Sequence, residues 1–149
     1  MLHEDITKRV LEAAMKVHTA LGPGLLESAY HACLHYEFAM SGLQFTHLVR
    51  LPFVYHGLQL DAGYRIDFLV ENCVIVEFKA VEKLLPLHLA QVLSYLKLSG
   101  RPVGLLINFN VPHLRQGIRR VVNGYGEQKQ DLTSVSPVSS VVESSRVVD

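Results

Sequence analysis

At residues 73–79 the chain reads Cys73-Val74-Ile75-Val76-Glu77-Phe78-Lys79, an apolar run that becomes charged only at its end. Apolar residues at successive positions cover both faces of a strand, which is the pattern of a central, buried strand. A helix is predicted at 86–99, where Pro86 starts it, and residues 103–109 form another apolar strand. Residues 73–109 therefore have the length and order of a βαβ unit, with parallel strands and a right-handed connection.

Two further strands are predicted before this unit, at residues 43–55 and 63–70. Glu71-Asn72 is a short hairpin loop that joins the second of them to residues 73–79. His56-Gly57 marks a turn, and Pro52 suggests a sheet edge or a bulge. Together with residues 73–79, these strands form a predicted antiparallel meander of three strands.

Helices are predicted on both sides of the strands in the sequence. Residues 4–20 and about 25–40 have apolar side chains at helical spacing, and Gly22-Pro23-Gly24 separates the two segments. A short last helix is predicted from the spacing of Leu114, Ile118 and Val121. The order is therefore α-α-β-β-β-α-β-α, an α/β fold in the α+β sense, with a mixed sheet and helices on its faces.

The 149 residues fit one domain at 1–124 and a loosely ordered tail at 125–149, which is rich in Ser and Val. We expect a cytoplasmic protein, because no apolar stretch reaches the length of a membrane span and the N-terminus lacks an apolar signal region. Cys33 and Cys73 are too few for a disulfide framework. The net charge is zero, so binding to phosphates would have to be local.

Three charged residues on two neighbouring predicted strands form a candidate metal site. Glu77 and Lys79 are two apart on a strand and so point to the same face. With Asn72 at the turn, Asp67 lies opposite Glu77 across the hairpin. Two carboxylates that close repel each other unless a cation lies between them, and hard oxygen ligands favour Mg²⁺ or Mn²⁺. A structural salt bridge from Lys79 to either carboxylate is the alternative.

Three other patterns have two interpretations each. Glu27, His31 and His35 are one helical turn apart and could bind Zn²⁺. One stripe of the helix at 86–99 could face the metal site or solvent; it carries His88, Gln91 and Tyr95. The predicted last helix has a cationic side that could contact phosphates or simply be solvated, formed by Arg115, Arg119 and Arg120.

The chain also resembles the bacterial GxxExxY proteins. The signature is matched by Gly24-Leu25-Leu26-Glu27-Ser28-Ala29-Tyr30. The other blocks occur in the family's order over roughly residues 4–123: Gly63-Tyr64-Arg65-Ile66-Asp67, Val76-Glu77-Phe78-Lys79-Ala80-Val81-Glu82, Gln91-Val92-Leu93-Ser94-Tyr95-Leu96 and Gly104-Leu105-Leu106-Ile107-Asn108-Phe109. That family is placed in the PD-(D/E)XK nuclease superfamily.

The resemblance implies a restriction-endonuclease-like core and a metal-dependent nuclease that hydrolyses phosphodiester bonds of DNA, or RNA, with Mg²⁺ or Mn²⁺. The metal ligands it implies are Asp67, Glu77, the backbone carbonyl of Phe78 and Glu27. The catalytic residues it implies are Asp67, Glu77, Lys79, Gln91 and Glu27. A catalytically silent nucleic-acid-binding or protein-interaction module on the same fold stays open at this point, as does a homodimer.

Overall fold

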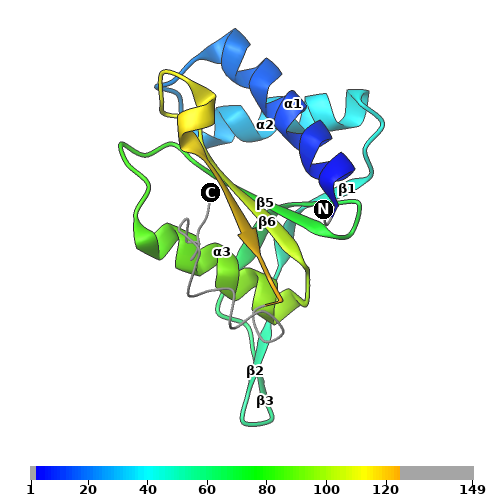
Figure 1. Cartoon of the computed structure of the whole chain (residues 1–149). Coiled ribbons are helices and arrows are strands. Elements are labelled where there is room, and N and C mark those ends of the chain that lie inside the picture. Colours follow the sequence, from blue (N-terminus) through cyan, green and yellow to red (C-terminus); the bar gives the residue numbers. More distant parts are fainter. Residues whose placement is uncertain (1–2, 125–149) are drawn as a thin grey trace.

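The computed structural model describes residues 3–124, which form a mixed sheet with helices on both faces. The order of the five-stranded sheet is β1-β4-β5-β6-β7, and every neighbouring pair is antiparallel except β5 and β6. Figure 1 shows α1 and α2 over one face of this sheet and α3 over the other. The strand bounds are Phe45–Arg50 for β1, Arg65–Val70 for β4, Val74–Lys79 for β5, Val103–Asn108 for β6 and Ile118–Val122 for β7.

The three helices span Glu4–Leu21 (α1), Glu27–Met40 (α2) and Pro86–Ser99 (α3), close to their predicted bounds. Gly100 ends α3 in the left-handed conformation, with φ 73° and ψ 15°. Tyr30 is fully buried, donates its hydroxyl hydrogen bond to the Gly22 carbonyl at 2.6 Å, and stacks on Phe109. Tyr30 therefore ties α2 to the preceding turn. Tyr30 contacts a backbone carbonyl and an aromatic ring in these interactions, so its role here is structural.

The βαβ unit and the hairpin before it are confirmed. β5 pairs with β6 in parallel from Val74↔Val103 to Lys79↔Asn108, and all six residues of β6 are buried. The β4–β5 turn contains Glu71 and Asn72, both with left-handed φ, at 52° and 55°. The register of the hairpin pairs Val70 with Val74 and Phe68 with Val76. The hairpin is therefore centred on Asn72, as the spacing predicts.

The predicted last helix is wrong. Residues Leu114–Gly117 form a single 3-10 turn, and β7 follows as a strand antiparallel to β6. β6 would otherwise present unpaired backbone groups at the sheet edge, and β-branched Ile118, Val121 and Val122 suit a strand. Gly117 fits this turn because a side chain there would meet the Asn108 carbonyl. The arginines consequently lie on a turn and a strand, and Arg119 donates to the carbonyls of Gln116 and Ile118.

The predicted strand at 43–55 is two strands. β1 ends at Arg50, and beyond Pro52 the chain forms a separate hairpin of β2 (Phe53–Tyr55) and β3 (Leu58–Leu60). Proline has no N–H to donate to a sheet, so the break falls there. His56 and Gly57 form the turn with φ of 50° and 79°. In Figure 1 this hairpin projects from the body of the molecule.

Two hydrophobic cores lie on opposite faces of the sheet. The larger packs α1 and α2 on residues such as Phe68, Val76 and Phe78, and the smaller packs α3 on residues such as Leu69 and Ile75. The described helices include none long and apolar enough to cross a membrane. The predicted tail, 125–149, lies outside the described residues.

Candidate functional site

Asp67 and Glu77 lie where the β4–β5 ladder stops. Backbone pairing ends at Phe68↔Val76, and beyond it each carboxylate takes the place of a backbone acceptor. Glu77 Oε2 accepts the Asp67 N–H at 2.8 Å, and Asp67 Oδ2 accepts the Phe78 N–H at 3.1 Å. Each acid thus accepts a backbone N–H from the opposite strand, and the two carboxylates lie side by side, as the hairpin register predicts.

Strand β4 is deformed at Asp67. In a regular strand Ile66 and Phe68 would point to the same face, because side chains alternate. Here Ile66 packs in the core beneath α3, whereas Phe68 packs in the core beneath α1 and α2. The β1–β4 register also skips Leu48, whose φ is 53°. The deformation directs the Asp67 side chain along the sheet toward the backbone of Phe78.

The protonation of the pair follows from its burial. Glu77 is only 4% exposed, and burial, followed by the charge of Asp67, raises the pKa of Glu77 to about 9. Burial also raises the pKa of Asp67, which the hydrogen bond from the Phe78 N–H opposes. Two carboxylates in contact cannot both be charged without a neighbouring cation. At neutral pH the pair therefore shares a proton or takes up a cation in its place.

A third oxygen, the carbonyl of Phe78, points toward the same place. The N–H and C=O of one strand residue point to the same side of the strand. Since the Phe78 N–H reaches Asp67, the Phe78 carbonyl also faces β4, beyond the end of the ladder. The donors gathered here are carboxylate and carbonyl oxygens, which suit Mg²⁺ or Mn²⁺.

Lys79 follows on β5 and is held by α3. Its ammonium donates to Gln91 Oε1 at 3.2 Å. Within residues 3–124 it forms no ion pair with Asp67 or Glu77, although its charge lowers the pKa of both. The alternative prediction, a structural salt bridge from Lys79 to Asp67 or Glu77, is therefore wrong. Lys79 stays beside the carboxylates with its position set by a neutral partner.

The polar stripe of α3 faces the site. Tyr95 is buried, and burial, then the charges of Glu77 and Asp67, raise its pKa. Its hydroxyl also interacts with the Gln91 side chain. His88 accepts the Leu85 N–H at 2.9 Å and caps the start of α3, and burial followed by the charge of Lys79 lowers its pKa. Of the two interpretations of this stripe, the site-facing one describes the structure.

Glu27 reaches the rim of the site from the start of α2. Its Oε2 accepts the N–H of Ala80, the residue after Lys79, at 3.2 Å. Its charge adds to burial in raising the pKa of Asp67. Glu27 is exposed and bound to backbone, so it stands beside the Asp67–Glu77 pair, at its solvent side.

Asn108 is a site residue that the sequence interpretation missed. It is 1% exposed at the end of β6, beside Lys79 in the register. Its side chain accepts the Val81 N–H at 3.1 Å and donates to the Val81 carbonyl at 2.9 Å. This pair of hydrogen bonds holds the segment that follows Lys79, in which the Ala80 N–H donates to Glu27. The available signal was a polar residue at the end of an apolar strand.

We expect Asn108→Ala to lower the free energy of unfolding by about 2 kcal/mol, because it leaves the partly buried backbone groups of Val81 without a partner. Urea unfolding followed by circular dichroism measures this change. Asn110→Ala is the matched control, since the structure uses only the backbone N–H of Asn110 in this network, and it should change stability by less than about 0.5 kcal/mol. Equal stability of the two variants would contradict the bracing role of Asn108.

The alternative Zn²⁺ site is not formed. His31 Nε2 lies 3.1 Å from Nδ1 of His47, and its ring stacks on Phe68 with centroids 4.4 Å apart. Glu27 is turned away to Ala80. Within residues 3–124, no three His, Cys, Asp or Glu side chains come together as a ready-made metal site. An ion at Asp67 and Glu77 would therefore need carbonyl and water oxygens as well, which Mg²⁺ commonly uses.

The comparisons with known proteins show the family to which the chain belongs. A family model for the PD-(D/E)XK nuclease superfamily matches residues 4–121, a span that includes Asp67, Glu77 and Lys79. Comparison with curated proteins found no match, and neither did comparison with solved structures. The five-stranded mixed sheet with helices on both faces is consistent with the restriction-endonuclease-like fold of this superfamily. The chain belongs to the PD-(D/E)XK nuclease superfamily.

Proposed function

We propose that this protein is a nuclease that hydrolyses phosphodiester bonds of DNA, or of RNA, with Mg²⁺ or Mn²⁺. The observation that carries the proposal is the buried Asp67–Glu77 pair, which is short of positive charge and lies next to Lys79. Burying two acids costs stability unless something compensates them. A divalent cation and a phosphate would supply that compensation together.

In this proposal Asp67, Glu77 and the Phe78 carbonyl hold the ion, and Glu27 holds a second ion or an ion-bound water. A bound divalent ion supplies Lewis-acid chemistry, polarising a phosphate and lowering the pKa of water. Lys79 orients the attacking water and stabilises the negative charge that develops on the phosphate. Gln91 keeps the Lys79 ammonium in place through their 3.2 Å hydrogen bond, so it acts as a positioning residue.

We further propose that the chain is one of the bacterial GxxExxY proteins within the superfamily. The support is the segment Gly24 to Tyr30, in which Glu27 reaches the rim of the site and Tyr30 holds the turn before α2. The spacing of this signature thus places one acid at the site and one aromatic ring in the core.

A plasmid-nicking assay tests the proposed activity. Supercoiled DNA should be nicked in Mg²⁺ or Mn²⁺ and stay intact in EDTA. A structured RNA and a single-stranded DNA run beside it identify the preferred substrate. Glu12→Gln, on the exposed side of α1, is a charge-matched control that should cut as the wild type does. If the wild type binds metal but cuts no DNA or RNA in either ion, the protein is a binding module.

A further inference from the structure

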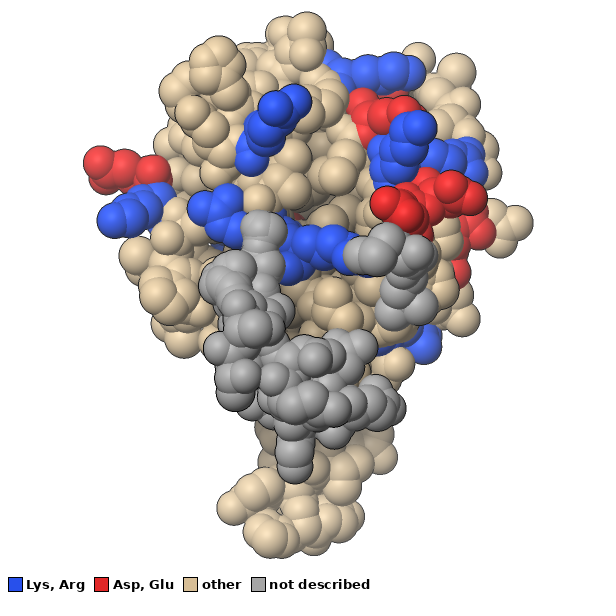
Figure 2. All heavy atoms as spheres, in the orientation of Figure 1, with Lys and Arg blue, Asp and Glu red and all other residues tan. Residues whose placement is uncertain are grey.

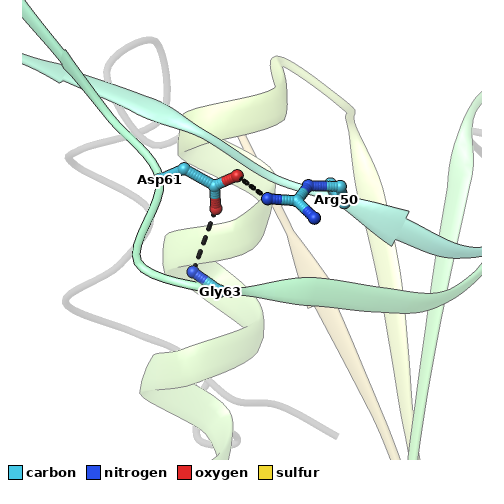
Figure 3. A network of polar contacts seen from close by, with 3 residues as sticks. All are labelled: Arg50, Asp61 and Gly63. Atoms are coloured by element: carbon cyan, nitrogen blue, oxygen red, sulfur yellow. Dashed lines mark hydrogen bonds and ion pairs between the residues drawn. The ribbon is translucent and has the colours of Figure 1, made fainter.

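Two arginines face each other across strands β1 and β4. The β1–β4 register pairs Arg50 with Arg65, and Arg65 precedes Asp67 by two residues, about 7 Å along a strand. Like charges directly opposite each other destabilise a sheet. In Figure 3 Arg50 is paired with Asp61, whose other oxygen accepts the Gly63 N–H at 3.0 Å. Within residues 3–124 no carboxylate pairs with Arg65, which is exposed.

This arrangement suits an anion from outside the chain. The Arg50 side chain is 73% exposed, and exposed ion pairs contribute little, so Asp61 is readily exchanged. Guanidinium groups bind phosphate through paired N–H donors. The two arginines have one carboxylate partner, Asp61 on Arg50, which leaves net positive charge at the edge of the sheet, next to the proposed catalytic acids.

The β2–β3 hairpin begins at the same place and has the opposite character. Residues 53–60 contain no Lys, Arg, Asp or Glu, and in Figure 2 the projecting part is free of charged atoms on the face shown. Its apolar side chains are in solvent: Val54 is 66% exposed, Tyr55 61% and Leu58 59%. A two-stranded hairpin in water is marginally stable, so exposed apolar residues on one need a reason.

Aromatic side chains connect the hairpin to α3, the helix that also holds Lys79. The Phe53 ring lies 6.1 Å from the Tyr64 ring, which lies 6.0 Å from Tyr95 on α3. The Leu51 N–H also donates to the Tyr64 carbonyl at 2.9 Å. Tyr95 lies one turn of α3 after Gln91, whose Oε1 accepts a hydrogen bond from Lys79 beside the acid pair. The hairpin is therefore anchored beside the site and projects outward from it.

We propose that Arg50, Arg65 and the β2–β3 hairpin bind the nucleic acid next to the cleavage point, with a backbone phosphate on the two arginines and unpaired bases on Tyr55 and its apolar neighbours. This inference rests on the proposed function. It also narrows the substrate to nucleic acid with a single-stranded segment, because an aromatic ring stacks on a base only when that base is free. The arginines lie where the hairpin begins and its tip is uncharged. This order matches a nucleic-acid strand, in which charged phosphates lie on one side and uncharged nucleobases on the other.

The test is fluorescence anisotropy of labelled oligothymidine, and of the same oligomer with abasic residues, in Ca²⁺ over a series of salt concentrations. Arg65→Ala should weaken binding to both oligomers and reduce the slope of log K against log salt by about 0.7, the value for one phosphate contact on a single strand. Tyr55→Ala should weaken binding to oligothymidine about fivefold or more, leaving the slope and the abasic oligomer unchanged. Arg9→Ala on α1 is the charge-matched control and should behave as wild type.

The outcomes separate this inference from the proposed function. If the wild type cuts DNA or RNA but Arg65→Ala and Tyr55→Ala bind as Arg9→Ala does, only the extended binding surface is wrong. If the wild type neither binds nor cuts any nucleic acid, both proposals fail. If Tyr55→Ala binds DNA normally but converts a wild-type dimer to a monomer in size-exclusion chromatography, the hairpin is a protein interface and the inference is overturned.

Discussion

Lys79→Ala should reduce cleavage by at least about a hundredfold while leaving the affinity for Mg²⁺ or Mn²⁺ within about threefold of wild type. The ammonium is bound to Gln91 and not to the acids, so removing it takes away no metal ligand. A group that stabilises charge only in the transition state typically contributes a factor of 10²–10³ to the rate. Its loss also removes a positive charge near the ion, which favours metal binding slightly.

Asp67→Ala provides the contrast. It removes one of the two buried carboxylates, so metal affinity should fall at least about tenfold and cleavage should be lost as well. Calorimetric titration of metal into each variant, beside the nicking assay, separates the two effects. Lys16→Ala, on the exposed side of α1, is the control for removing a lysine charge. Metal binding that falls equally in Lys79→Ala and Asp67→Ala, or cleavage by Lys79→Ala at the wild-type rate, would refute this division of roles.

Glu77→Gln should stabilise the metal-free protein, increasingly so as the pH rises. Glu77 has a folded-state pKa of about 9 against an ordinary value of 4.5, so between these pH values the folded chain keeps a proton that the unfolded chain has lost. Retaining that proton costs free energy, and the stability of the wild type in EDTA therefore falls as pH rises, by up to about 1.4 kcal/mol per pH unit. Glutamine has no proton to retain and can still accept the Asp67 N–H.

Between pH 6 and pH 8 the variant should therefore gain up to about 3 kcal/mol relative to wild type. Urea unfolding in EDTA at the two pH values measures the difference, and Glu12→Gln should show no such gain. Added Mg²⁺ should reverse the order, because it stabilises the wild type and the variant has lost a ligand. Parallel pH profiles for wild type and Glu77→Gln in EDTA would show that the Glu77 carboxyl is not the group that holds the proton.

Much of the fold was predictable because its decisive patterns are local. The apolar run at 73–79 with a helix and a second apolar strand after it leads to a parallel βαβ unit, and few other arrangements satisfy that order. The turn at Glu71-Asn72 then fixes the register of the hairpin by chain length alone. That register was enough to bring Asp67 and Glu77 together, and the helical spacing of His88, Gln91 and Tyr95 was enough to suggest a common face.

Spacing was misleading where the same residues fit two periods. Leu114, Ile118 and Val121 are spaced as on a helix, yet Ile118–Val122 is a strand, because the open edge of β6 offers backbone partners that no local pattern reveals. Glu27, His31 and His35 share one helix face, yet Glu27 does not join the two histidines, whose rings both lie against His47. Glu27 binds the backbone of Ala80, and His31 binds His47, which lies on a strand sixteen positions away.

The sequence by itself determined the parallel βαβ unit, the hairpin register and the identity of the acid pair. The tertiary structure alone decided how that pair is presented. Ile66 and Phe68 must each fill a different core, and this demand deforms β4 at Asp67 and turns its carboxylate toward the Phe78 N–H. Likewise Asn108 became a brace only because β6 ends beside Lys79. Packing between segments distant in the sequence sets the positions of the Asp67 and Asn108 side chains. The periodicity of apolar residues along the chain carries no information about that packing.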